Sequence, residues 1–328
     1  MSFLNFVLPL GSSVLSLVFA AMVFDQWLQR RKSFQLVWAL GLLWYAVATG
    51  CEFLGGTFGW SSPLYRAWYL FGAFLVPSYL GVGTLYLLNK TRFGYFVAVS
   101  VALGGLFSLA ATAKYPGSSV AGYTTLALAL VAAVAIAGAT AVRRELQAHV
   151  AMVCLVAGTL VVATLVLMAR LSGAYIDPAT SAPIAAAFPG YLRVTSVPFN
   201  AGGGLSLLFG ALYSAYIYMP KKRLLPARLA ALAITVNFFA SLPGAARALF
   251  EGKLNSRVPA TILIALGAFI PGLTSSLNRF GITWATFLGE FLGVLLIFIG
   301  FLVSEEVFRN VRLGTTIWSR RSLEGEAG

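Results

Sequence analysis

The chain has 328 residues, of which 59% are hydrophobic and only 10% are charged, and its net charge is +13. Soluble domains are typically about 45–50% apolar and about 25% charged, so this composition excludes a soluble globular protein. The basic residues are scattered between apolar runs, without the aromatic-basic motif of a nucleic-acid surface. We therefore expect them to contact anionic membrane lipids, and we expect no nucleic-acid partner.

Ten apolar segments follow one another along the chain. Continuous apolar runs of roughly 18 or more residues are typical of membrane-spanning helices, whereas a barrel strand alternates apolar and polar residues. The sequence thus predicts an all-α, polytopic transmembrane bundle over residues 1–304 and a short polar tail over residues 305–328. The predicted segments are 6–28, 34–55, 65–88, 94–112, 123–142, 149–169, 200–219, 227–248, 258–276 and 282–303.

The basic loops predict that the N-terminus lies outside. With that orientation the inside loops hold twelve Lys and Arg residues and the outside loops hold seven, as the positive-inside rule requires. A tenth crossing would place the tail, with four arginines, on the outside, although its charge favours the inside. Both nine and ten crossings therefore stay open.

Two late segments are interrupted by a Pro-Gly pair. Pro243-Gly244 lies in "SLPGAARALF" and Pro271-Gly272 lies in "FIPGLTSSLNRF". Proline removes a helix hydrogen bond and glycine loosens the backbone, so we expect either segment to break or re-enter the membrane. The long connection 171–199 is predicted to lie outside, either as a lid or capping element or as a linker between helix groups.

Three polar side chains in apolar surroundings, Glu52, Arg66 and Asn237, are candidates for structural or solute contacts. Glu52 ends the second segment and Arg66 opens the third. An ion pair between them would form a clamp, a gate or an anion-attracting entrance at the outer boundary. Asn237 lies near the middle of the eighth segment, where an asparagine usually bonds a neighbouring helix for under about 2 kcal/mol.

Glu290, in "FLGEFLG", is the leading candidate site residue. It lies about eight residues, or roughly 12 Å, into its apolar run. A central acid costs about 2.5–3.5 kcal/mol to insert, so such residues are functional candidates by default. Gly289 and Gly293 would let a partner helix approach this face. Three roles compete: a neutral interhelical hydrogen bond, an ion pair, and a proton or cation site. No second deep acid is evident from the sequence.

Catalytic and metal-binding patterns are missing from the sequence. The chain has a single histidine, His149, and its two cysteines, Cys51 and Cys154, lie in apolar segments. It contains no HExxH, nucleophile elbow, CxxC or paired-acid motif. We therefore expect neither an enzyme nor a metal or other cofactor.

Two blocks carry a resemblance to known proteins. "YRAWYLFGAFLVPSYLGVGTLYLL" (65–88) and the stretch from "LIALGAFIPGLTSSLNRFG" to "FLGEFLGVLLIFIGFL" (263–302) resemble a group of uncharacterised bacterial multi-pass membrane proteins. The resemblance implies a bacterial plasma membrane but no activity. In size and segment number the chain is also similar to ten-helix drug/metabolite exporters, whose termini both lie inside.

These features favour a transporter-like protein for a small or lipophilic solute. Several crossings, two interrupted segments and isolated polar groups beside them are typical of transporters. The alternative is a non-catalytic accessory subunit or membrane sensor that packs against other subunits or a second copy of itself. A polar cavity that reaches Glu290 would favour transport, whereas a solid bundle with a wide apolar face would favour the alternative.

Overall fold

A computed structural model describes residues 3–178, 181–226, 230–251, 253–255, 257–279 and 285–303. Among these residues the regular structure is helical, apart from one isolated bridge between Ile176 and Pro183. The all-α class is thereby confirmed. The predicted polar tail, 305–328, lies outside the described residues.

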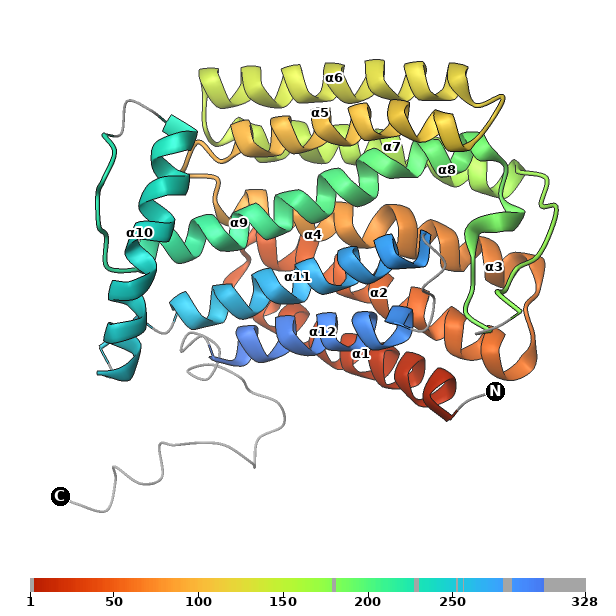
Figure 1. Cartoon of the computed structure of the whole chain (residues 1–328), viewed down its shortest axis with the longest axis horizontal. Coiled ribbons are helices and arrows are strands. Elements are labelled where there is room, and N and C mark those ends of the chain that lie inside the picture. The colour runs from red at the N-terminus through yellow and green to blue at the C-terminus, as the bar shows by residue number, and fades with distance from the viewer. Residues whose placement is uncertain are drawn as a thin grey trace.

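Most helices run along the long axis of the molecule (Figure 1). Two of the rods are composite, because α3, η1 and α4 follow one another without a break, as do α8, η4 and α9. The bounds are α1 Phe3–Arg30, α2 Ser33–Phe58, α3 Ser62–Tyr69, η1 Leu70–Leu75, α4 Val76–Leu87, α5 Gly94–Ala111, η2 Thr112–Lys114, α6 Ser119–Val142, α7 Leu146–Met168, η3 Ala185–Ala187, α8 Gly190–Val197, η4 Pro198–Gly202, α9 Gly203–Tyr218, α10 Ala230–Phe250, α11 Arg257–Arg279 and α12 Ala285–Val303.

Eight described helices are long and apolar enough to cross a membrane, namely α1, α2, the rod 62–87, the helix 94–114, α6, α7, α11 (residues 257–274) and α12. Each coincides with one of the predicted segments. The segments predicted at 200–219 and 227–248, which correspond to α9 and α10, are not among the eight.

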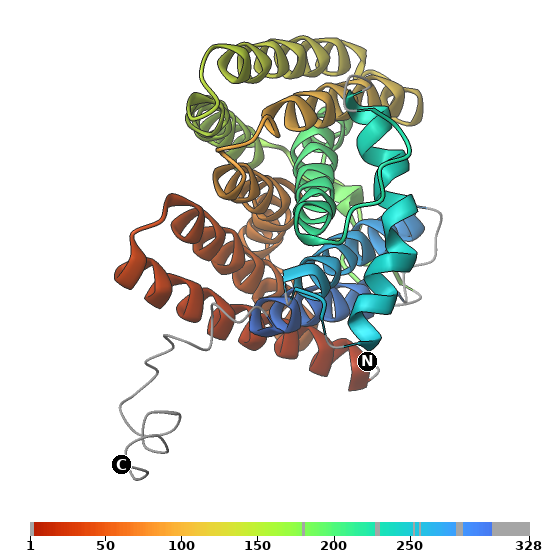
Figure 2. The same cartoon turned by 90° about the vertical axis from the view of Figure 1, so that its left-hand side faces the viewer.

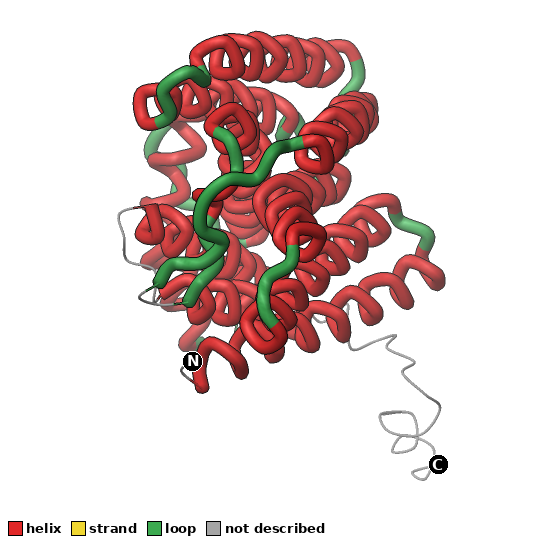
Figure 3. Tube along the Cα trace, turned by 90° about the vertical axis from the view of Figure 1, so that its right-hand side faces the viewer, coloured by secondary structure: helices red, strands yellow, loops and turns green. Residues whose placement is uncertain are grey.

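The bundle has two distinct ends. We call the end covered by residues 169–178 and 181–189 the loop end, which Figure 3 shows with the loops in front. We call the opposite end, with Arg30–Lys32, Arg143-Arg144 and Lys221–Arg223, the basic end. Helix α10 lies across the other helices at the basic end, in both views (Figures 1 and 2). It therefore does not run alongside the helices that it follows and precedes.

Glycines set the closest helix crossings around the centre of the bundle. A Cβ on Gly203 of α9 would lie 2.4 Å from the carbonyl carbon of Pro77 in α4. On α12, a Cβ on Gly289 would lie 2.2 Å from Thr274 Oγ1, and one on Gly293 would lie 2.3 Å from Pro271 Cγ. The expectation that the glycine face beside Glu290 lies against a partner helix is thus confirmed, and the partner is α11.

Three local expectations are wrong. Pro243 lies inside a continuous α10 and Pro271 inside a continuous α11, so neither Pro-Gly pair breaks its helix. One lost hydrogen bond does not end a helix when the flanking turns remain helical, and Pro271 packs against α12. The connection predicted at 171–199 is also shorter, because α8 already begins at Gly190.

Candidate functional site

A cavity of about 450 Å³ lies within the bundle. Near the loop end it is lined by the exposed Lys114 and by Ile184, and from there it follows α12 between Thr286 and Ile297. At 1.5 Å per residue that stretch of α12 is roughly 16 Å long. The polar side chains of the lining are Tyr45, Thr49, Glu52, Trp68, Tyr69, Lys114, Tyr115, Arg193, Ser196, Asn200, Thr286 and Glu290.

Two carboxyl groups meet in the wall of this cavity. Glu52 comes from α2 and Glu290 from α12, and their side chains lie within hydrogen-bonding reach of each other. Glu52 is only 3% exposed, whereas Glu290 is partly exposed to the cavity that it lines. Glu290 lies five residues, or roughly 8 Å, from the start of α12, so the pair is well inside the helical part of the bundle.

Aromatic side chains fix the carboxyl pair in place. The indole Nε1 of Trp68 donates a hydrogen bond to Glu52 Oε1 over 2.8 Å. The hydroxyl of Tyr45 donates one to the backbone carbonyl oxygen of Glu290, also over 2.8 Å, and so ties α2 to α12. The other carboxyl oxygens, Glu52 Oε2 and Glu290 Oε2, are buried and receive no hydrogen bond from a donor of the described chain.

Two π-helical segments line the cavity and face each other. Segment η1, 70–75, precedes Pro77, and segment η4, 198–202, begins with a proline. The Ser78 hydroxyl of α4 bridges them, since it lies 2.7 Å from the carbonyl oxygen of Phe74 in η1 and 2.9 Å from that of Phe199 in η4, both as acceptors. π-Helical turns are frequent at functional sites. The irregular helices beside the cavity are therefore η1 and η4, and not the segments with the Pro-Gly pairs. Three residues of the cavity lining, Gly72, Ala73 and Asn200, belong to η1 and η4.

Packing elsewhere compensates for the proline in η4. Because Pro198 has no N–H, the carbonyl oxygen of Val194 loses its usual partner four residues later. The Ser108 hydroxyl of α5 takes that place and donates to Val194 O over 2.9 Å. The irregular turn is thus held by a neighbouring helix, which keeps the cavity wall defined.

The expected ion pair between Glu52 and Arg66 is wrong. The Arg66 guanidinium donates to the carbonyl oxygens of Val166 and Ala169, the latter over 2.7 Å, and so binds the C-terminal end of α7. Such carbonyls have no partner within their own helix, and a cation suits the negative end of the helix dipole. Trp68 is two residues further along α3, on another face, and it is this residue that reaches Glu52. The clamp therefore joins α3 to α7, and the proposed gate or anion entrance at this pair is also wrong.

Asn237 is buried but does not line the cavity. Its Oδ1 accepts the N–H groups of Leu224 and Leu225 over 2.7 and 2.9 Å, and its Nδ2 donates to Leu225 O. The asparagine thus fastens the segment after α9 to α10, instead of bonding a neighbouring helix. Pro271 and Gly272 line the cavity, whereas Pro243 and Gly244 do not.

The connection, described over 169–178 and 181–189, covers the loop end as a packed cap. The ring of Tyr65 is stacked between Tyr175 and Phe188, with centroids 4.3 and 4.9 Å away. The Tyr65 hydroxyl donates to the carbonyl oxygen of Ile184, and residues 183–186 line the cavity. The packing agrees with the prediction of a capping element and not with that of a linker between helix groups.

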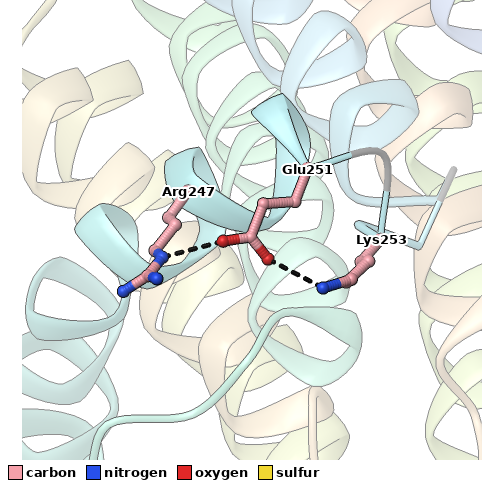
Figure 4. A network of polar contacts seen from close by, with 3 residues as sticks. All are labelled: Arg247, Glu251 and Lys253. Carbon is pink, nitrogen blue, oxygen red and sulfur yellow. Dashed lines mark hydrogen bonds and ion pairs between the residues drawn. The ribbon is translucent and has the colours of Figure 1, made fainter.

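A second cluster of charges lies at the end of α10, and none of its residues lines the cavity (Figure 4). Glu251 accepts from Arg247 Nε over 2.8 Å and from Lys253 Nζ over 3.1 Å. These two hydrogen bonds lower the pKa of the exposed Glu251 carboxyl. Because Glu251 is an acid in water with basic partners, it offers a matched control for the pair in the cavity.

Sequence reasoning singled out Glu52 and Glu290 separately and missed Tyr45, Trp68 and Tyr69. Among the described residues, no three His, Cys, Asp or Glu side chains gather into a group that could hold a metal ion. No protein-family model, curated protein or solved structure matches this chain.

Proposed function

We propose that the chain is an integral membrane transporter whose solute site is the cavity beside Glu52 and Glu290. The observation that carries this proposal is a partly polar cavity inside a bundle of membrane-length helices. Its size is within the range of about 300–1,000 Å³ that is usual for small-molecule sites. The solid bundle expected of an accessory subunit would have no such space at Glu290.

The irregular helices support the same function. Transporter sites are typically built where transmembrane helices are discontinuous, because displaced turns expose backbone and polar groups to a cavity. Segments η1 and η4 supply this irregularity on two composite rods that pack against each other and line the cavity. The resemblance of residues 65–88 and 263–302 to bacterial multi-pass proteins suggests the plasma membrane of a bacterium as the location.

We also infer nine crossings, with the loop end outside. Because α10 lies across the bundle, we count eight spans and the rod 190–218, which runs parallel to them (Figure 1). The described basic residues then divide thirteen to five. The basic end holds Arg30, Arg31, Lys32, Lys90, Arg92, Arg143, Arg144, Lys221, Lys222, Arg223, Arg247, Lys253 and Arg257, and the loop end holds Arg66, Lys114, Arg170, Arg193 and Arg279.

This division obeys the positive-inside rule more strongly than ten crossings do. An odd number of crossings also resolves the conflict over the tail, since the chain leaves α12 at the basic end (Figure 1). The four arginines that follow Val303 in the sequence then begin on the inside, together with the other basic clusters.

Labelling of a cavity cysteine tests the proposed function. Gly204 lines the cavity, and a Cβ built there has no atom within 4 Å, so a cysteine fits. We introduce Gly204→Cys after replacing Cys51 and Cys154 by alanine. A membrane-impermeant sulfonated maleimide is then applied outside intact cells and, separately, to inside-out vesicles.

A transporter exposes its solute site to each side in turn, so we expect Gly204→Cys to be labelled from both sides. Labelling from one side only would indicate a receptor or sensor and would contradict transport. The control is Val131→Cys on α6, because Val131 is 68% exposed on the surface of the bundle, away from the cavity. A charged reagent should leave this membrane-facing cysteine unlabelled from either side.

A further inference from the structure

The carboxyl pair has unused hydrogen-bonding capacity. The Glu52 residue is only 3% exposed, and its Oε2 receives no hydrogen bond from a donor of the described chain. Glu290 Oε2 is in the same situation, and both residues line the cavity. Two buried carboxyl oxygens without a hydrogen-bond donor thus belong to residues of the cavity wall.

Electrostatics decide what can occupy this position. Two ionised carboxylates at hydrogen-bonding distance repel strongly where bulk water is excluded. A carboxyl–carboxyl hydrogen bond, by contrast, needs one proton. This position therefore favours a proton shared by the two carboxyl groups, and a cation is the kind of group that can replace that proton without leaving two negative charges in contact.

The surroundings suggest which cation. Tyr45 and Trp68 contact the two glutamates, and Tyr69 lines the same cavity. Aromatic side chains of this kind bind ammonium groups through their π-faces. Further along α12 the wall becomes apolar, with Leu80, Leu207 and Ile297. A cavity of about 450 Å³ is much larger than a bare metal cation needs. These features fit a cationic head with an apolar body.

We propose that Glu52 and Glu290 form an exchange site at which an organic ammonium ion takes the place of the shared proton. When the cation binds, the carboxyl O–H bond breaks, the proton leaves to water in the cavity, and an ammonium–carboxylate ion pair forms. One positive charge enters and one leaves, so the charge of the site is unchanged. This inference rests on the proposed solute site and adds the class of solute and the coupled ion.

The other charged or titratable groups near the pair offer no second carboxylate for a cation among the described residues. The groups that line the cavity are Tyr45, Tyr69, Lys114, Tyr115 and Arg193, and Cys51 precedes Glu52 on α2. The Arg193 guanidinium lies over the Tyr115 ring, 4.4 Å from its centroid. Among the described lining residues, the two glutamates are the acids, so they are the place where a cation can rest.

Calorimetric titration of the full-length purified protein with benzyltrimethylammonium tests the exchange. This probe has an aromatic body and a permanent charge, so its own protonation never changes. Titrations between pH 5.5 and 7.5, in buffers of different ionisation enthalpy, count the protons released. We expect one proton to be released for each bound cation. Linkage then requires the Kd to fall about tenfold for each unit by which the pH rises.

The variants Glu52→Gln and Glu290→Gln should each weaken binding at least tenfold, and the exposed control Glu251→Gln should not. Absence of binding, a Kd independent of pH, or full displacement of the probe by an equal concentration of Na⁺ would each overturn the proposal. The proton count on the unchanged protein decides the matter even if a variant fails to fold. If Gly204→Cys is labelled from both sides but no ammonium binds, only this inference fails. If the ammonium binds with release of a proton but Gly204→Cys is labelled from one side only, the binding site stands and the proposed transport fails.

Discussion

Replacing Glu290 by leucine or by glutamine separates a buried polar pair from an isolated acid. Glutamine keeps nearly the same shape, and its amide N–H can donate to Glu52 as a protonated carboxyl does. Leucine offers no donor, so the buried Glu52 carboxyl loses its contact with residue 290 and keeps only the hydrogen bond from Trp68. We therefore expect Glu290→Leu to lower the stability of the protein more than Glu290→Gln.

The size of this difference follows from the stranded group. Leaving one buried polar group unpaired costs about 1–3 kcal/mol. For domains of about 150–250 residues, each kcal/mol corresponds to about 2–4 °C in Tm, so Glu290→Leu should melt roughly 2–12 °C below the parent. The Tyr45 hydrogen bond is retained in both variants, because it uses the backbone carbonyl of residue 290.

The assay is thermal unfolding of the purified protein in one detergent, with parent, Gln and Leu proteins at the same concentration. The Gln variant should melt close to the parent. Equal melting temperatures for all three proteins would refute the reasoning, because Glu290 would then have no buried partner and the contact with Glu52 would be absent.

Three further changes probe the packing around the site. Gly203→Ala should cost about 1–3 kcal/mol because its Cβ meets Pro77, whereas the adjacent Gly204→Ala should be neutral in the same melting assay. Gln147→Leu should cost at least about 2 kcal/mol, since this buried side chain accepts from Gly94 N and donates to two loop carbonyls; a parental Tm would contradict that role. In a double-mutant cycle, Arg66→Met and Glu52→Gln should add within about 0.5 kcal/mol, and a larger coupling would restore the abandoned ion pair.

The membrane-spanning helices could be predicted from the sequence because each depends on its own residues. A continuous apolar run satisfies its backbone internally and its side chains in lipid, so length and hydropathy suffice to locate it. The close contact at Gly289 and Gly293 was also predictable, since small residues at four-residue spacing let helices approach. Segment 227–248 shows the limit of this reasoning, because Asn237 binds a loop and α10 lies across the bundle.

The pairing of Glu52 with Glu290 could not be predicted, because it depends on which helices are neighbours. The two residues are 238 positions apart, on α2 and α12, and nothing local links them. Proximity in sequence instead suggested Arg66 for Glu52, but the free carbonyls at the end of α7 compete for the guanidinium. The π-helical turns were missed for the same reason, since Ser108 and Ser78 stabilise them from outside their own helix turns.

The account depends most on one proton shared between Glu52 and Glu290, and infrared difference spectroscopy observes that proton directly. We predict that the parent protein at neutral pH shows the C=O stretching band of a protonated carboxyl. The band should vanish in Glu52→Gln and also in Glu290→Gln, because either amide can pair with the remaining carboxylate without a proton, and it should persist in Glu251→Gln. Absence of the band in the parent, or its persistence in both cavity variants, would contradict the shared proton.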